Sequence, residues 1–359
     1  MRITFLLPVD NLTGGNRVVA IYAQQLIARR HEVLVVTCAP DRMRPREMAK
    51  TILKRDWQHL RNSTTPPPGH IALSGVPHKI LDRPRAISAD DVPDADIVIA
   101  TWWETAVWMH DMPASKGRKV HLIQGYEVWM GPQAIAHVHA ALQLPNLKIA
   151  ISSDLKQTIE ARLGPLGISV VPNAVDLNQF NAPARELQNP PTVGFVYAIA
   201  AIKGADICAQ ACELARRQIP ELQVIAFGAD MPSPQVPLPL GTEFFHRPAQ
   251  NELKQIYSRC DVWLFGSRLD SFGLPILEAM ACRTPVVAVP IGAAPDLLGD
   301  GTGVLVAKES PEEMAVAIVA MCSQTPEDWK LCSDRAHHKA HSYSWIEAGT
   351  RLLDVLQRP

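Results

Sequence analysis

Apolar and polar positions along the first half of the chain follow two alternating patterns. Short runs rich in Val, Ile and Leu predict buried strands, and the longer stretches between them carry apolar residues at helical spacing. The clearest helical stretch runs from about residue 16 to residue 29. An alternation of strand and helix is typical of a parallel, doubly wound α/β sheet. The predicted strands of this half are residues 2–7, 33–36, 96–101, 119–124, 148–152 and 169–171.

The alternation stops in a stretch that carries three prolines, residues 173–192, and then restarts. We place a domain boundary there, between residues 1–173 and residues 174–341. Ligands of doubly wound sheets bind beyond the carboxyl ends of the strands, so two such sheets facing each other would form an interdomain cleft. The second half has predicted strands at 192–197, 223–228, 261–266 and 285–289, and predicted helices at 203–217, 251–258 and 274–282.

The composition indicates a soluble globular chain, because 47% of its 359 residues are hydrophobic and 20% are charged. A net charge of -1 argues against a nucleic acid partner. Seven cysteines without paired spacing indicate reduced thiols in a cytosol. The N-terminal run is better interpreted as a strand than as a signal peptide, and no apolar run approaches the ~20 residues of a membrane helix. We therefore expect a cytoplasmic protein.

One segment, from Arg42 to Asn62, carries a local excess of positive charge. It contains seven Lys or Arg and two acidic residues, which leaves +5. Its apolar residues recur at helical spacing, so it could lay an amphipathic helix on an anionic membrane, at the inner face of the plasma membrane. The alternative is a solvated helix that packs its apolar stripe on its own domain. Both interpretations stay open at this point.

The most informative stretch is SRLDSFGLPILEAMACRTPVVAVP, residues 267–290. A loop after a predicted strand carries Asp270, and the Phe272–Gly273 turn frees backbone N–H groups at the start of a helix near Leu274. Such N–H groups favour negative charge, as a phosphate or a sugar oxygen supplies. Asp270 and Glu278 flank the turn as acceptors for hydroxyl groups. The alternative, a surface acid plus one capping carboxylate, leaves the turn unexplained.

This stretch resembles the donor-site signature of the family 4 glycosyltransferases, retaining enzymes of GT-B fold in which two Glu residues flank a Gly-Phe-Gly-Leu-Pro turn. Asp270 stands at the first acidic position and Glu278 at the second, while Ser271 replaces the first Gly and Arg283 departs from the Gly usual downstream. The resemblance implies that Asp270 contacts hydroxyls of the donor sugar and that Glu278 holds the nucleotide ribose. Because Asp is one methylene shorter than Glu, we expect the sugar to sit closer or a water to bridge.

The resemblance also implies the architecture of the chain. It predicts two Rossmann-like domains facing each other across a cleft, with an acceptor-side domain at 1–173 and a nucleotide-sugar-binding domain at 174–341. The last helix, within residues 342–359, is expected to cross back to the first domain.

A second stretch, VGFVYAIAAIKGAD, resembles the segment that opens the second domain in this family. Lys203 enters a helix after a strand, where its compact charge can meet a diphosphate, although a surface Lys before Gly204 is the alternative. The family often places an Arg earlier in this segment, where this chain has Tyr197, so one cation is missing. Tyr197 and Gly228, at the ends of predicted strands, are further candidates for contact with the donor.

A third stretch, LPVDNLTGGNRVV, places Gly14 and Gly15 between the first strand and a helix. A Gly pair there lets the backbone approach a phosphate or a sugar closely, although the full GxGxxG pattern is absent. The resemblance implies that this loop meets the donor diphosphate from the first domain, with Asn16 or Arg17 adding a side-chain contact.

Two segments that follow predicted strands of the first domain resemble acceptor-side segments in a subset of the family. They supply aromatic faces and hydrogen-bonding groups that suit a sugar, and the alternative is that the Trp residues are core residues beneath a helix. The acceptor-side candidates are Trp102, Trp103, Glu104, Thr105, Gln124, Tyr126 and Glu127.

Two patterns in the sequence could suggest a metal site, and we interpret neither as one. Asp94 and Asp96 match the Asp-x-Asp of metal-dependent transferases, but they begin a strand and so lie at the wrong end of the sheet. His337, His338 and His341 lie on a late helix pattern, where we identify no set of carboxylate or Cys partners that would complete a zinc site. We therefore expect no metal and no cofactor.

The resemblance implies a retaining hexosyltransferase, and because the sequence shows no metal-binding pattern we expect it to be metal-independent. Its donor would be a nucleotide diphosphate sugar, with UDP-glucose or a similar UDP-sugar as the first guess and GDP-mannose next. Its acceptor would be a hydroxyl of a glycan or a lipid-linked sugar, in polysaccharide biosynthesis. The catalytic candidates are Lys203, Asp270 and Glu278. The alternatives are a GT-B sugar-nucleotide epimerase and a non-catalytic partner subunit that binds the nucleotide sugar.

Overall fold

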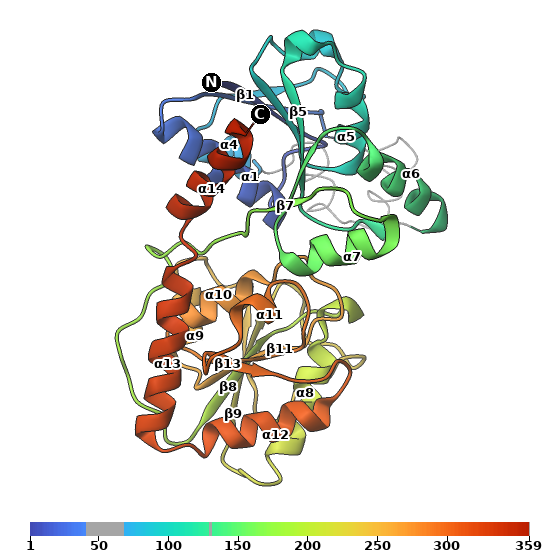
Figure 1. Cartoon of the computed structure of the whole chain (residues 1–359). Coiled ribbons are helices and arrows are strands. Elements are labelled where there is room, and N and C mark those ends of the chain that lie inside the picture. The colour runs from blue at the N-terminus through green and yellow to red at the C-terminus, as the bar shows by residue number, and fades with distance from the viewer. Residues whose placement is uncertain (41–67, 129–130, 359) are drawn as a thin grey trace, which may run out of the picture. The chain divides into compact units, whose positions relative to one another are not determined.

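A computed structural model describes residues 1–40, 68–128 and 131–358 of the chain (Figure 1). The basic segment from Arg42 to Asn62 lies outside the described residues. The chain divides into two compact units. The first unit comprises Met1–Ala150, Ile159–Ser169 and Arg351–Pro359, and the second comprises Ile151–Thr158 and Val170–Thr350.

The sheet of the first unit has the strand order β3-β2-β1-β4-β5-β6-β7. Strand β1 pairs in parallel with both β2 and β4, and the core between sheet and helices includes Leu6, Val98 and Met109. Because the strand order reverses between β1 and β4, the loops after these two strands open at the place where doubly wound sheets bind ligands. The strands are β1 (Arg2–Leu7), β2 (Glu32–Thr37), β3 (His78–Ile80), β4 (Ile97–Ala100), β5 (Arg118–Ile123), β6 (Leu147–Ala150) and β7 (Ser169–Val170).

Helices flank this sheet as the sequence pattern predicts for a doubly wound fold. The helices are α1 (Gly14–Ala28), α4 (His70–Ser74), α5 (Trp103–His110) and α6 (Pro132–Gln143), with short 3-10 turns at Ala89–Asp91 and Ala114–Lys116. Two further helices, α7 (Ser153–Leu163) and α14 (Trp345–Gln357), each contribute residues to both units.

The second unit contains a six-stranded parallel sheet with the order β10-β9-β8-β11-β12-β13. Its order reverses between β8 and β11, so the loops after these two strands are neighbours although they are far apart in sequence. The strands are β8 (Thr192–Val196), β9 (Gln223–Gly228), β10 (Glu243–His246), β11 (Val262–Phe265), β12 (Val286–Ala288) and β13 (Gly303–Leu305). The helices are α8 (Ala205–Ala215), α9 (Leu253–Ser258), α10 (Leu274–Ala281), α11 (Ala294–Leu297), α12 (Pro311–Cys322) and α13 (Pro326–His341), with a 3-10 turn, η4, at Ala201–Lys203.

The proline-rich linker is fastened to the second unit by a buried carboxylate. Asp261, which is fully buried, accepts hydrogen bonds from Arg185 Nη1 at 2.9 Å, Gln188 N at 3.0 Å and Thr192 N at 2.8 Å. The division of the chain accordingly falls at Val170, shortly before the boundary predicted after residue 173. The return to the first unit begins at Arg351, within α14, rather than at residue 342.

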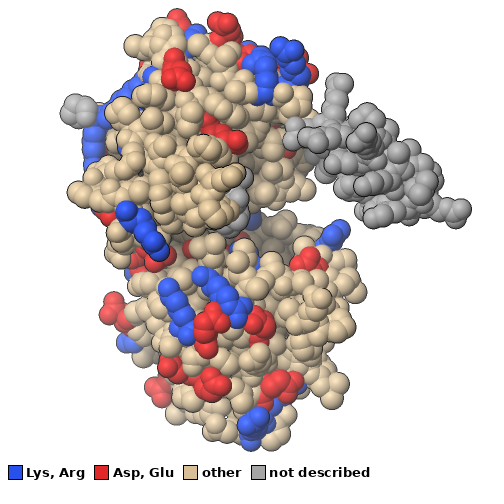
Figure 2. Space-filling model, turned by 90° about the vertical axis from the view of Figure 1, so that its right-hand side faces the viewer, with Lys and Arg blue, Asp and Glu red and all other residues tan. Residues whose placement is uncertain are grey.

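Charge is distributed without a single-sign stripe on the face seen in Figure 2, where acidic and basic side chains of the second unit are interspersed. Across the part of the chain that the structure describes, no helix is both long and apolar enough to cross a membrane.

Candidate active site

The loops after β8 and β11 bring Lys203 and Asp270 together. Lys203 ends the η4 turn, and its Nζ lies 2.9 Å from Asp270 Oδ2. Gly204 follows with φ 63°, and a Cβ there would lie 1.9 Å from the carbonyl oxygen of Gly266 at the end of β11. Only glycine at position 204 allows the two loops to approach this closely. The contact between their backbones therefore sets the position of Lys203. Two motifs that are 67 residues apart in sequence thus form one ion pair.

The second oxygen of Asp270 is also engaged. Its Oδ1 accepts hydrogen bonds from Phe272 N at 3.1 Å and Gly273 N at 2.8 Å. The sequence led us to expect that the Phe272–Gly273 turn would leave these N–H groups free for a ligand. That expectation is wrong for the structure as described, because the carboxylate of Asp270 caps its own turn.

Glu278 lies on α10 and is 8% exposed. Its Oε2 accepts a hydrogen bond of 2.8 Å from the hydroxyl of Tyr257 on α9. Burial raises the pKa of Tyr257 well above its usual value, and the carboxylate of Glu278 raises it further. Tyr257 therefore stays protonated and holds the Glu278 carboxylate in position. The sequence pattern did not single out Tyr257.

Arg268 was also missed by the sequence analysis, although it fastens the turn that carries Lys203. Its guanidinium makes two hydrogen bonds of 2.8 Å with Asp206 on α8 and a third, of 2.6 Å, to Ala201 O. Glu309 pairs with Arg268 Nε at 2.6 Å. Arg268 lowers the pKa of Asp206, so Asp206 is ionised in the neutral range. The η4 turn is thereby held at both ends.

A short segment of the second unit, residues 151–158, supports the same loops from another side. Ser152 is buried and donates from Oγ to Ser271 O at 2.7 Å. Asp154 Oδ2 accepts a hydrogen bond of 3.0 Å from Gly292 N. The backbone of Ser271, which replaces a family Gly, is therefore tied to the start of α7.

Tyr197 and Gly228 lie at the ends of the neighbouring strands β8 and β9. A Cβ on Gly228 would lie 2.2 Å from Tyr197 O, so the two backbones touch. Tyr197 is 1% exposed, and its hydroxyl donates to Val236 O at 2.8 Å and accepts from Ser233 N at 2.8 Å. In the described structure the Tyr197 hydroxyl thus anchors the loop after β9. Tyr197 does not supply the positive charge that the Arg often found in this segment supplies in the family.

In the first unit, the Gly14–Gly15 pair begins α1, after β1. Gly15 lies against the side-chain amide of Gln124, and Asn16 donates from Nδ2 to Val9 O at 2.8 Å. Asn16 therefore fixes the glycine loop through its side chain.

The residues after β4 form the first turn of α5. Thr105 is fully buried, and its Oγ1 accepts from Thr101 N and Trp102 N and donates to Trp102 O. These bonds give Thr105 a structural role in capping the helix. Trp103 stacks on His137 of α6 with ring centroids 6.0 Å apart, and its buried Nε1 has no hydrogen-bond partner among the described residues. Glu104 lies in the same turn and is partly exposed.

The residues after β5 lie at the adjacent strand end. Tyr126 stacks on His139, and its hydroxyl lies 2.6 Å from His139 Nε2. The buried Oε1 of Gln124 finds no partner within the described ranges. Burial raises the pKa of Glu127 to about 8, so this carboxyl is largely protonated at neutral pH. Buried polar atoms of this kind are what a polar ligand would satisfy.

The residues that could have suggested a metal have other partners. Asp96 Oδ2 accepts a hydrogen bond of 2.7 Å from Arg2 N, and Asp94 pairs with Lys116 at 3.0 Å. His337 contacts Asn181 at 3.2 Å. In the described portion of the chain, no group of three His, Cys, Asp or Glu side chains could hold a metal ion.

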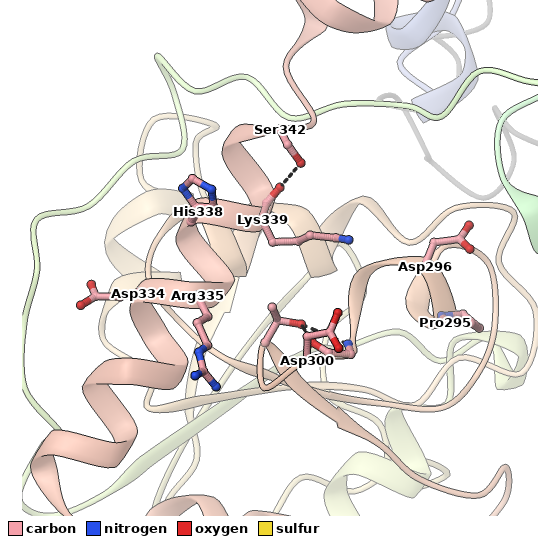
Figure 3. A pocket seen from close by; sticks show the side chains of 10 residues that line it. Pro295, Asp296, Asp300, Asp334, Arg335, His338, Lys339 and Ser342 are labelled. Atoms are coloured by element: carbon pink, nitrogen blue, oxygen red, sulfur yellow. Dashed lines mark hydrogen bonds between the residues drawn. The ribbon is translucent and has the colours of Figure 1, made fainter.

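A pocket of about 700 Å³ lies between α13 and the segment joining α11 to β13 (Figure 3). Arg335 and Lys339 project from one face of α13 on one side, and Asp300 lies on the other. The pocket includes none of the predicted donor or acceptor residues. Asp334, at its edge, pairs with Arg283.

Comparison with known proteins agrees with this geometry. A family model described as Glycosyltransferase Family 4 matches residues 12–179, and one described as Glycosyl transferases group 1 matches residues 190–324. The chain belongs to the family 4 glycosyltransferases. The two matches include residues of both compact units, and the second includes the donor-site signature at residues 267–290.

Curated relatives match over part of their length. The D-inositol 3-phosphate glycosyltransferase of Segniliparus rotundus is 32% identical over 209 residues, which cover 53% of this chain and 46% of the relative. That of Stackebrandtia nassauensis is 28% identical over 226 residues, 55% of this chain and 51% of the relative. The chain thus spans about half the length of these relatives.

Solved structures match over the full length. Anabaena HepE in complex with UDP and glucose has a TM-score of 0.72 at 18% identity, with 99% of each chain covered. Sucrose-phosphate synthase from Thermosynechococcus elongatus has a TM-score of 0.70 at 16% identity, covering 99% of this chain and 98% of that one. The predicted fold class, two Rossmann-like domains of GT-B type, is confirmed.

Proposed function

We propose that the protein is a retaining glycosyltransferase, which moves a sugar from a nucleotide diphosphate sugar to a hydroxyl of a glycan or lipid-linked acceptor in polysaccharide biosynthesis. The observation that carries the proposal is the contact of Lys203 with Asp270 at the reversal point of the second sheet. The contact supports the proposal because it joins a cation suited to phosphate to a carboxylate suited to sugar hydroxyls, at the end of the sheet where ligands of doubly wound folds bind.

The chemistry proposed for this site is electrostatic. Lys203 would stabilise the negative charge that develops on the departing diphosphate, and Asp270 would orient the sugar through its hydroxyls. Glu278, held by Tyr257, would accept hydrogen bonds from the ribose. The acceptor hydroxyl would attack from the face that the diphosphate leaves, so the mechanism uses no protein nucleophile. We propose that it also requires no metal.

The proposed donor and acceptor are supported by a fold neighbour and by relatives that match over part of their length. HepE is a fold neighbour in complexes with UDP and with UDP-glucose, which favours a UDP-sugar donor, with GDP-mannose next. The relatives named for D-inositol 3-phosphate favour a polyhydroxylated acceptor. The partly buried Trp103, Gln124 and Tyr126 and the buried Glu127 are candidates to contact it. We also retain the proposal that the segment from Arg42 to Asn62 contacts an anionic membrane from the cytoplasmic side.

The test is calorimetry of the full chain against UDP, GDP and dTDP sugars, followed by a transfer assay with the sugar that binds. We expect one nucleotide series to bind and the sugar to be transferred with retention, in the presence of a chelator. Activity lost in chelator and restored by magnesium or manganese would contradict the metal-free mechanism. Binding without transfer to any glycan or lipid-linked acceptor would favour a non-catalytic partner subunit.

A further inference from the structure

The two charged groups that the proposed function assigns to the donor are engaged with each other. Lys203 Nζ and Asp270 Oδ2 are 2.9 Å apart, while Asp270 Oδ1 is held by Phe272 N and Gly273 N. The capped oxygen fixes the carboxylate, so that its other oxygen faces Lys203. The side chain of Lys203 is 43% exposed and that of Asp270 is 18% exposed, so solvent and ligands reach the cation more readily than the anion.

We propose that Asp270 competes within the protein with the donor diphosphate for Lys203, and that the donor sugar relieves this competition. The inference rests on the proposed function and deepens it. On this proposal, Asp270 weakens the binding of the nucleotide diphosphate product and does not weaken the binding of the intact donor.

The reasoning follows from charge. A diphosphate that approaches Lys203 meets a carboxylate already on that ammonium, and like charges at this range repel. An intact donor draws the exposed Lys203 side chain away from Asp270 and brings sugar hydroxyls, which donate hydrogen bonds to the Oδ2 that Lys203 leaves. A nucleotide diphosphate without a sugar brings no such donors, so Lys203 returns to the carboxylate, which favours release of the product.

A purely structural role for Asp270 makes a different prediction. Ion pairs that are partly exposed contribute little to folding, so the pair is not needed for stability. Asn at this position keeps an oxygen that can cap Phe272 N and Gly273 N, and it removes only the charge. The variant Asp270→Asn therefore keeps the backbone cap and removes the carboxylate charge that competes with the diphosphate for Lys203.

Asp230 offers a matched control at the same end of the sheet. Its Oδ2 accepts a hydrogen bond of 3.0 Å from Ile199 N, after β8, so Asp230 is also a carboxylate that caps a backbone N–H. Its carboxylate is not the partner of Lys203, which pairs with Asp270. Asp230→Asn removes the same charge without freeing Lys203.

The experiment measures dissociation constants of UDP and UDP-glucose by calorimetry for the wild-type chain, Asp270→Asn, Asp270→Glu and Asp230→Asn, with GDP and GDP-mannose as a second pair. We expect Asp270→Asn to bind the nucleotide diphosphate at least threefold more tightly and the sugar nucleotide no more tightly than wild type. Asp270→Glu, which keeps the charge, should retain the wild-type preference, and Asp230→Asn should leave both affinities within twofold.

Three results have separate meanings. If Asp270→Asn binds the diphosphate as wild type does, or more weakly, the competition is wrong although the proposed function stands. If Asp230→Asn tightens binding as much as Asp270→Asn, the effect is general charge repulsion and the inference fails. If the wild-type chain binds neither pair nor any other nucleotide diphosphate, the proposed function itself fails. Thermal unfolding of each variant verifies that it is folded.

Discussion

Replacing Arg268 with Met should separate the stability of the second unit from the placement of Lys203. The substitution keeps much of the aliphatic volume but removes the hydrogen bonds to Asp206 and Ala201 O and the pair with Glu309. Hydrogen bonds to charged groups contribute about 1.5–3 kcal/mol, and partly exposed ion pairs about 0–1 kcal/mol. Because the Arg268 side chain is 28% exposed, we expect a loss of about 2 kcal/mol in the free energy of unfolding.

In a unit of this size such a loss lowers the midpoint of thermal unfolding by about 4–8 °C. The stabilisation depends on pH in a defined direction. Arg268 lowers the pKa of Asp206, so the contribution is present above the ordinary carboxyl pKa and is lost as pH falls through the lowered value. The difference between wild type and Arg268→Met should therefore shrink in acid, below about pH 4.

The same variant should weaken binding of UDP by threefold to tenfold, because the η4 turn loses its anchor at Ala201 and Lys203 samples more positions. Arg259→Met is the control, since Arg259 pairs with Glu243 at an exposed site and should change neither property by much. Urea unfolding and calorimetry measure the two effects. Stability lost without any change in nucleotide affinity would refute the positioning role of Arg268.

Three further predictions concern other parts of the chain. Burial raises the pKa of Glu127 from 4.5 to about 8, so the free energy of unfolding should fall as pH rises through that window, by about 5 kcal/mol at most. Glu127→Gln should remove this fall, and urea unfolding measured over a series of pH values checks it. Arg283 has φ 63° and pairs with Asp334, so Arg283→Ala should destabilise more than Arg283→Gly, by about 1 kcal/mol; equal thermal shifts would contradict the account. The Arg42 to Asn62 segment should make the chain sediment with anionic vesicles at low salt and release at high salt, whereas equal binding to neutral vesicles would argue against a charge-driven contact.

The sequence predicted the fold because parallel sheets leave a strong hydrophobic signature. The alternation of buried strands and helices predicted two doubly wound units, and the sequence placed Lys203 and Asp270 in loops that follow strands. The strand order of the structure then puts these loops, after β8 and β11, at one reversal point. The structure brings these two residues together. It also locates Gly14 and Gly15 at the start of α1, and the acceptor-side candidates at the start of α5, after β4, and in the residues that follow β5.

The sequence could not predict which groups each side chain would pair with or hydrogen-bond to. A loop pattern indicates that Asp270 is near a turn, but only the backbone path shows that its Oδ1 caps Phe272 N and Gly273 N. Tyr257 and Arg268 lack a local motif, because their partners come from other elements. The attachment of residues 151–158 to the second unit depends on Ser152 reaching Ser271 O, a contact between residues 119 apart.

The most direct test of the central claim is the affinity for UDP of Lys203→Ala compared with Lys254→Ala. Lys254 is an exposed lysine on α9, and its removal costs the same formal charge without touching the Asp270 loop. Loss of a charge-assisted contact of about 1.5–3 kcal/mol predicts that Lys203→Ala weakens binding by at least tenfold. Lys254→Ala should change it by less than twofold. Equal affinities for UDP in wild type and Lys203→Ala would contradict the assignment of the diphosphate to the loops after β8 and β11.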